Sequence, residues 1–204
     1  MTNSLEKIFN STPQPADFAR SYLDHLCAIL RRMDPAAIAA FIDVILQARN
    51  TEHTIFFIGN GGSAATASHF ANDLAVGTRS ARQPFRAISL TDNVPILTAI
   101  ANDYGYEETF VRQLHYLLHP GDVVVGISAS GNSPNVLKAI DYANASGAHT
   151  VGLTGFDGGR LRHMVETAVH VPTNAGEYGP VEDAHMILDH LVGGFLTLAC
   201  RAET

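Results

Sequence analysis

The residues IGNGGSAATASHFAND, from Ile58 to Asp73, decide the fold of this chain. Glycines end the short apolar run that precedes them, and a helical pattern begins at Ser63. A strand that turns through glycine into a helix is the repeating unit of parallel α/β proteins. The same helix carries His69 and Asp73 four residues apart, which places both on one face. This stretch therefore predicts a parallel sheet and candidate chemistry beside its first strand.

The rest of the chain repeats the alternation of apolar strand and helix. Strands are expected at residues 54–59, 85–90, 122–128, 149–155 and 167–172. Helices are expected at residues 63–76, 94–102, 106–118, 134–146 and 181–202. This alternation predicts a three-layer α/β/α sandwich around a five-stranded parallel sheet.

Two amphipathic helical patterns precede the first strand, within residues 16–49, and the second restarts at Pro35. This N-terminal helical pair needs an apolar surface to cover, either on its own domain or on another subunit. No linker or repeat divides the 204 residues, so we expect a single domain, 1–204, with residues 1–50 used for packing and oligomerisation.

Composition excludes several classes of protein. The net charge of −7 and the lack of a dense Lys/Arg cluster argue against direct nucleic-acid binding. No run of about 20 apolar residues suits a membrane span, and the N-terminus lacks the pattern of a signal peptide. Cys27 and Cys200 lie far apart without metal-ligand spacing, as expected of reduced thiols. We therefore expect a cytoplasmic protein.

Three expected strands end in polar loops of small residues: 59–63 (GNGGS), 89–93 (SLTDN) and 128–133 (SASGNS). Glycine lets the backbone approach a ligand, and a helix N-terminus favours an anion. Ser63 and Ser133 are also expected to cap the helices that follow them. Two glycine/serine loops at neighbouring strand ends favour a phosphate site over simple turns.

Nucleotide motifs fit these loops less well. A P-loop requires a lysine, and none follows either glycine/serine loop. GNGGSA partly matches the dinucleotide pattern, but no acidic residue ends the 85–90 strand to bind a ribose. Dinucleotide binding remains the weaker alternative.

Histidine and acidic residues recur on two expected helices. His69 and Asp73 could bind a metal, act as base and orienting partner, or form a surface pair. The last helix carries Glu182, Asp183, His185, Asp189 and His190, which could equally be ordinary surface residues. His190 stands out because its surroundings, MILDHLVGGFL, are largely apolar.

Together these segments resemble the sugar isomerase (SIS) fold, and within it the phosphoheptose isomerases. The resemblance rests on IGNGGSAATASHFANDL, AIANDYGYEETF, GDVVVGISASGNSPNVLKAI, VGLTGFDGG and VEDAHMILDHL, and it covers nearly the whole chain. It implies an aldose–ketose isomerase that converts sedoheptulose 7-phosphate to D-glycero-D-manno-heptose 7-phosphate through an enediol.

The resemblance also implies roles for individual residues. Asp73 and His190 take the positions of the catalytic acid/base pair. Zinc, which some members bind, would be held by His69, Asp73, Glu182 and His190. The substrate-binding residues implied are Asn60, Gly61, Gly62, Ser63, Asp73, Asn102, Asp103, Ser128, Ala129, Ser130, Ser133 and Glu182. Within this set the Ser128, Ser130 and Ser133 hydroxyls would hold the phosphate.

Three positions depart from the family pattern. Asp73 replaces a glutamate, Glu182 a glutamine, and Ala129 a hydroxyl residue. Moreover, Glu182 and His190 are eight residues apart, about 12 Å along a helix and about 80° around it. One metal would take both only if the helix began irregularly or if two subunits contributed. The family's tetramers, with active sites at subunit contacts, agree with the second option.

Two other functions remain open beside the isomerase. Close relatives serve as non-catalytic adaptors that bind a replication initiator, and a sugar-phosphate sensor would also use these loops. The presence of His69, Asp73 and His190 together favours the enzyme, because an adaptor needs neither an acid/base pair nor a metal site.

Overall fold

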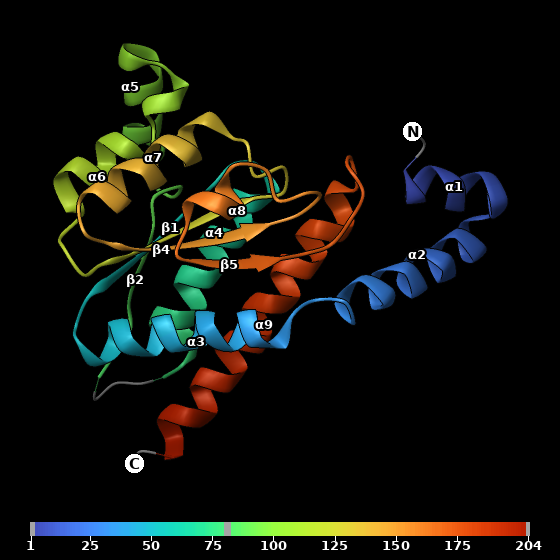
Figure 1. Ribbon diagram of the computed structural model, residues 1–204, viewed down its shortest axis with the longest axis horizontal. Coiled ribbons are helices and arrows are strands. Elements are labelled where there is room, and N and C mark those ends of the chain that lie inside the picture. Colours follow the sequence, from blue (N-terminus) through green and yellow to red (C-terminus); the bar gives the residue numbers. More distant parts are fainter. Residues whose placement is uncertain (1–2, 80–82, 203–204) are drawn as a thin grey trace.

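The computed structural model describes residues 3–79 and 83–202, and a parallel sheet in the order β2-β1-β3-β4-β5 lies at its centre (Figure 1). The strands are β1 (Thr54–Gly59), β2 (Arg86–Ser89), β3 (Val123–Ser128), β4 (His149–Thr154) and β5 (Thr167–His170). All four strand pairs are parallel. The predicted α/β sandwich with a five-stranded parallel sheet is therefore confirmed.

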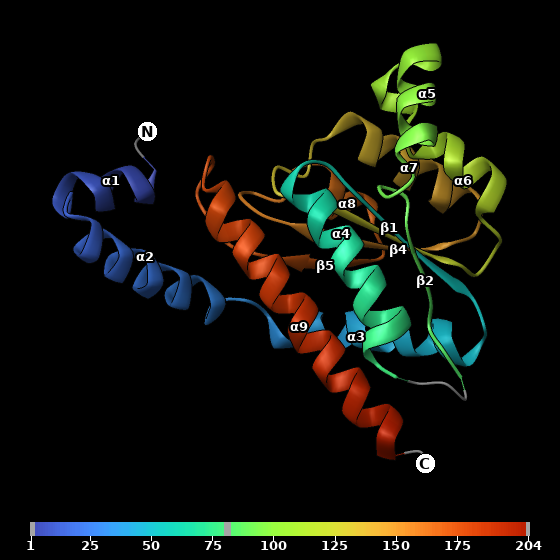
Figure 2. The same ribbon diagram turned by 180° about the vertical axis from the view of Figure 1, so that it is seen from behind.

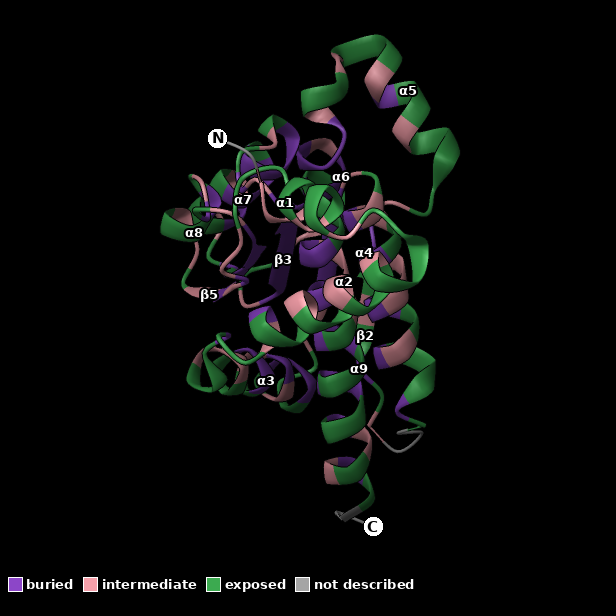
Figure 3. Ribbon diagram, turned by 90° about the vertical axis from the view of Figure 1, so that its right-hand side faces the viewer, coloured by how far each residue is buried: buried purple, intermediate pink, exposed green. Residues whose placement is uncertain are grey.

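Helices cover both faces of this sheet. The covering helices are α3 (Pro35–Asn50), α4 (Gly62–Asn72), α6 (Val111–Leu117), α7 (Pro134–Ala145), α8 (Leu161–Met164) and α9 (Tyr178–Ala202). The other helices are α1 (Ser4–Ser11) and α2 (Pro15–Leu30), which precede them, and α5 (Val94–Tyr104), which follows β2. One apolar core joins the sheet to α3, α4 and α9, and a second joins it to α6, α7 and α8. The three inner strands β1, β3 and β4 are buried almost throughout, which explains why they read as continuous apolar runs (Figure 3).

The N-terminal region differs from the predicted helical pair, because α1 was not expected. The helices α1 and α2 form an arm that extends away from the sheet (Figures 1 and 2). Glu177, just before α9, binds this arm: its carboxylate accepts the Ser4 N–H at 2.8 Å and lies 3.3 Å from His25 Nε2. Of the N-terminal helices, α3 packs against β1, β3 and β5 of the sheet, and it begins at Pro35 behind an Asp34 side-chain cap.

The strand order identifies where a ligand would bind. The chain passes from β1 outward to β2 and then returns to the other side of β1 to form β3. Ligands of such sheets bind beyond the carboxyl ends of the strands on either side of this reversal. Gly59 pairs with Ile127, so the loops that follow β1 and β3 leave the sheet side by side. Both glycine/serine loops singled out in the sequence lie there.

Along the described residues, no helix combines the length and hydropathy needed to cross a bilayer. The two cysteines are free, Cys27 exposed and Cys200 buried.

Candidate active site

The packing of α4 against α9 brings four potential metal ligands together (Figure 2). His69 comes from the last turn of α4, Asp73 directly follows that helix, and Asp189 and His190 come from the middle of α9. One donor atom from each lies within 4.8 Å of the other three. The sequence predicted three of the four and placed Glu182 where the structure has Asp189.

His69 lies at the centre of this His/Asp group. Its Nε2 is 3.3 Å from His190 Nε2, 3.5 Å from Asp73 Oδ2 and 3.6 Å from Asp189 Oδ2. Two donors each about 2.0–2.1 Å from one tetrahedral ion would be about 3.4 Å apart. The spacing and the donor types, two imidazoles and two carboxylates, therefore fit a zinc-like ion.

Local backbone geometry positions the first two members. Phe70 stacks on Phe57 of β1 with ring centroids 5.1 Å apart, which fixes the neighbouring His69 on the outer side of α4. At Asp73 the helix changes to a π-turn, Asp73–Gly77, closed by a hydrogen bond from Thr78 N–H to the Asp73 carbonyl. Single π-turns of this kind recur at functional sites, because they re-aim one side chain.

Asp189 is the member of the His/Asp group that the sequence did not assign to a site. It is 1% exposed, and neither carboxylate oxygen has a hydrogen-bond partner among the described residues. Burial, together with the negative charge of Asp73, raises the pKa of Asp189 to about 7, and His190 partly opposes this. The available signal was periodicity, since Asp189 lies within the apolar stripe that contains Val181, Leu188 and Val192.

The sequence singled out His190 because its neighbours are largely apolar, but the buried histidine of α9 is a different one, His185. His190 is exposed, whereas His185 is fully buried. Burial lowers the pKa of His185 to about 4, although the Thr154 backbone opposes this, so the ring is neutral at pH 7. His185 is therefore a core residue, one helical turn before Asp189.

Side-chain amides join the loops that follow β1 and β3. Asn60 and Asn135 donate to each other's carbonyl oxygens at 2.9 Å, and the Tyr106 hydroxyl also donates to Asn60 Oδ1, at 2.8 Å. Both acceptor positions of Asn60 Oδ1 are thus used, whereas one N–H of its Nδ2 remains available. Asn60 is therefore presented as a hydrogen-bond donor.

The loop from Ser128 to Ser133 is compact and held by its own hydroxyls. Ser128 Oγ and Ser133 Oγ lie 3.0 Å apart, and Ser130 Oγ accepts the Asn132 N–H. Gly131 is required there, since its φ is +63° and a Cβ would lie 1.9 Å from the Gly158 carbonyl oxygen. The three serine hydroxyls and the N-terminus of α7 converge on one loop, as an oxyanion site requires.

The two expected serine caps were wrong in detail. Helix α4 begins at Gly62 behind Gly61, whose φ is +56°, so Ser63 lies inside the helix and is buried. Ser133 occupies the cap position of α7, but its hydroxyl bonds Ser128 and not the helix backbone. The hydroxyl is thus directed into the loop.

Comparison with known proteins agrees with this geometry. The SIS domain model matches residues 21–155. The phosphoheptose isomerase of Geobacter metallireducens is 41% identical over 85% of this chain and 90% of its own, and that of Trichlorobacter lovleyi is 38% identical over 85% and 89%. A solved phosphoheptose isomerase from Neisseria gonorrhoeae superposes with a TM-score of 0.80 at 30% identity, over 90% of this chain and 98% of its own. The chain belongs to the phosphoheptose isomerase family of SIS-domain proteins.

Family resemblance implied that Asn102 and Asp103 bind substrate, but within one chain they lie apart from the His/Asp group. Both are exposed on α5, which protrudes from the body of the molecule (Figure 1). Their amide and carboxylate bond each other at 2.8 Å.

Glu182, implied as a zinc ligand in this family, also lies away from the His/Asp group. It is two turns before Asp189 on the same continuous helix, and its carboxylate faces the glycine loop. A Cβ on Gly62 would come within 2.3 Å of Glu182 Oε2. Burial and the charge of Asp183 raise the pKa of Glu182.

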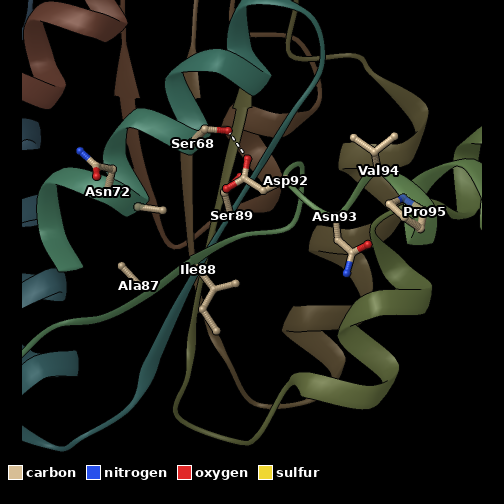
Figure 4. A pocket seen from close by; sticks show the side chains of 10 residues that line it. Ser68, Asn72, Ala87, Ile88, Ser89, Asp92, Asn93, Val94 and Pro95 are labelled. Atoms are coloured by element: carbon tan, nitrogen blue, oxygen red, sulfur yellow. Dashed lines mark hydrogen bonds between the residues drawn. The ribbon is translucent and has the colours of Figure 1, made fainter. Parts of the chain in front are cut away.

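In the third polar loop of the sequence, SLTDN after β2, the side chains bond mainly to one another and to α4. Ser68 donates to Asp92 (Figure 4), and the Ser89 and Thr91 hydroxyls lie 2.6 Å apart. Ser68, Ser89 and Asp92 border an open groove between α4 and the start of α5 (Figure 4). The loop fixes α5 relative to α4 and contributes no member to the His/Asp group.

Proposed function

We propose that this protein is an aldose–ketose isomerase that converts sedoheptulose 7-phosphate to D-glycero-D-manno-heptose 7-phosphate. The observation that carries the proposal is the meeting of Asp73 and His190 across α4 and α9, beside two ligand-binding loops at the reversal of the sheet. Relatives named phosphoheptose isomerase, matched over most of both chains, support the choice of substrate.

Different loops bind the phosphate and the sugar of the substrate. The phosphate is anchored by the Ser128, Ser130 and Ser133 hydroxyls and by backbone N–H groups of the same loop, while Ala129 contributes only backbone. Asn60, with Gly61, Gly62 and Ser63, holds the sugar, and Asn60 donates to one of its oxygens. This anchoring fixes the reacting carbons near the acid/base pair.

Asp73 acts as base and removes a proton from carbon 1 of the ketose, while His190 delivers a proton to the carbonyl oxygen on carbon 2. The product of this step is an enediol. Return of a proton to carbon 2, with loss of the proton on the carbon 1 hydroxyl, forms the aldehyde. Asn72 Nδ2 donates to Asp73 Oδ1 at 3.0 Å, which leaves Oδ2 directed toward His69.

The proposal includes one zinc ion per subunit at the His/Asp group. Bound zinc would polarise the oxygens on carbons 1 and 2 of the substrate. The fit of the donor spacing and of the donor types supports zinc at this position.

The proposal also includes a cytoplasmic homotetramer with active sites at subunit contacts. Ile187, Leu191, Phe195 and Leu198 form an apolar stripe on the outer side of α9, each at least 39% exposed. Such a stripe on a single chain favours contact with another subunit. Contact along α9 would bring α5 of one subunit, with Asn102 and Asp103, near the substrate site of another. Light scattering should give the mass of a tetramer, and Phe195→Asp should reduce it; a monomeric wild type would contradict this part.

Turnover of the named substrate tests the proposal as a whole. Purified protein is incubated with sedoheptulose 7-phosphate, and the aldose product is identified by chromatography. Asp73→Asn and His190→Ala should each lower kcat by about 100-fold or more. The matched control is Asp183→Asn, a neighbouring carboxylate outside the His/Asp group. Absence of product from wild-type protein supplied with zinc would overturn the proposal.

A further inference from the structure

The carboxylate of Asp189 has no structural partner that accounts for its burial. The residue is 1% exposed on α9, and both oxygens lack hydrogen bonds among the described residues. Burying an ionised carboxylate without partners costs several kcal/mol, so an ordinary core position would carry an apolar residue or an amide. The burial of this side chain therefore points to a ligand that the protein chain does not itself supply.

The surroundings of Asp189 specify the chemistry of that ligand. Oδ2 lies 3.6 Å from His69 Nε2, and a donor atom of Asp73 and one of His190 complete a group within 4.8 Å. An anion is excluded, because two carboxylates already face this point. Two imidazoles and two carboxylates form a neutral complex with a divalent cation and suit zinc in particular.

Glu182 cannot join the His/Asp group of its own chain. It precedes Asp189 by seven residues, or about 10 Å along a regular helix, and α9 is continuous from Tyr178 to Ala202. Its carboxylate instead lies against Gly62, at the loop that follows β1. A carboxylate there is placed to meet a sugar hydroxyl.

We propose that Asp189, and not Glu182, is the fourth protein ligand of a divalent metal held by His69, Asp73 and His190. The inference rests on the proposed use of the His/Asp group as a metal site and extends it to a residue that the family resemblance did not assign. All four ligands then come from α4 and α9 of one chain, so metal binding does not require a second subunit. Glu182 is free to face the substrate.

Zinc affinity of the metal-stripped protein tests this assignment directly. Wild type, Asp189→Asn and Glu182→Gln are titrated with Zn²⁺ against a chromophoric chelator, without any substrate. Asp189→Asn should weaken zinc binding at least about 10-fold, since loss of even an outer-shell partner typically has that effect. Glu182→Gln, the matched exchange of carboxylate for amide on the same helix, should stay within about 2-fold. The reverse order of the two variants would overturn the proposal.

Thermal melting gives a second readout and checks that the variants fold. Without metal, Asp189→Asn should melt at or above the temperature of wild type, because it removes an unpartnered buried charge and keeps the shape. Zinc should raise the melting temperature of wild type and of Glu182→Gln by more than that of Asp189→Asn at the same zinc concentration. A full zinc-induced rise in Asp189→Asn would contradict the proposal. Neither readout involves turnover, so failure of the isomerase assay would leave this test standing.

Discussion

Two buried carboxylates, Glu177 directly before α9 and Asp189 in its middle, differ in their hydrogen bonds. Glu177 is 0% exposed and accepts hydrogen bonds from Ser4 and Asn174. Burial alone would raise its pKa, but these hydrogen bonds outweigh burial and lower it to about 2. Asp189 is equally buried but has no such donors, and its pKa rises to about 7.

The difference shows how a structural carboxylate can be told apart from a candidate functional one. A charge that the fold satisfies with its own N–H groups stabilises the native state. A charge that the fold buries and leaves unsatisfied destabilises it unless a ligand or reaction uses that charge. The two carboxylates are thus distinguished by whether the protein donates hydrogen bonds to them, more than by their burial or their proximity to other acids.

The largest expected effect concerns activity. Asp189→Asn should lower kcat for sedoheptulose 7-phosphate about 100-fold, because the His/Asp group loses one of its two carboxylates. Glu177→Gln should stay within about 3-fold of wild type, since it lies with the N-terminal arm. Initial rates of both variants at saturating zinc decide the matter. Equal losses of kcat in the two variants would contradict the proposed difference between Asp189 and Glu177.

Stability should show the opposite ranking. Glu177→Gln replaces a doubly accepting carboxylate with an amide, whose NH₂ would face the Ser4 and Asn174 donors. We expect the free energy of unfolding to fall by about 2 kcal/mol, measured by urea denaturation. The arm should also become more susceptible to proteolysis between α2 and α3. An unchanged unfolding curve would show that Glu177 is not a stabilising group.

The pH dependence of stability should further distinguish Glu177→Gln from wild type. The pKa of Glu177 in the folded state lies below the ordinary value of 4.5. Its contribution is therefore complete above about pH 4.5 and is lost as the pH falls toward 2. The stability difference between wild type and Glu177→Gln should shrink over that window. Urea titrations at pH 5 and pH 3 measure it, and a constant difference would contradict the assigned hydrogen bonds.

Local sequence patterns were sufficient to predict the strands and three members of the His/Asp group. Continuous apolar runs predicted all five strands, and residue spacing together with the family resemblance singled out His69, Asp73 and His190. Asp189 was present in the same list of polar residues but carried no assignment, because only the packing of α4 on α9 shows which side of the helix faces His69. Glu177 and α1 were missed for the same reason: the Ser4 to Glu177 contact joins residues 173 positions apart.

The smallest expected effect concerns Asn60, whose side chain has a satisfied acceptor and an unsatisfied donor. Asn60 has its carbonyl oxygen satisfied by Tyr106 and Asn135, while one N–H of its amide remains available for substrate. Tyr106 is 61% exposed, so Tyr106→Phe removes one hydroxyl without disturbing a core. Loss of that hydrogen bond lets the amide rotate, and KM should rise about 3-fold, the equivalent of about 0.7 kcal/mol, with kcat within about 2-fold. Tyr104→Phe, two residues earlier and also exposed, is the matched control. A rise in KM common to both variants would show that Tyr106 acts through α5 and not through the orientation of Asn60.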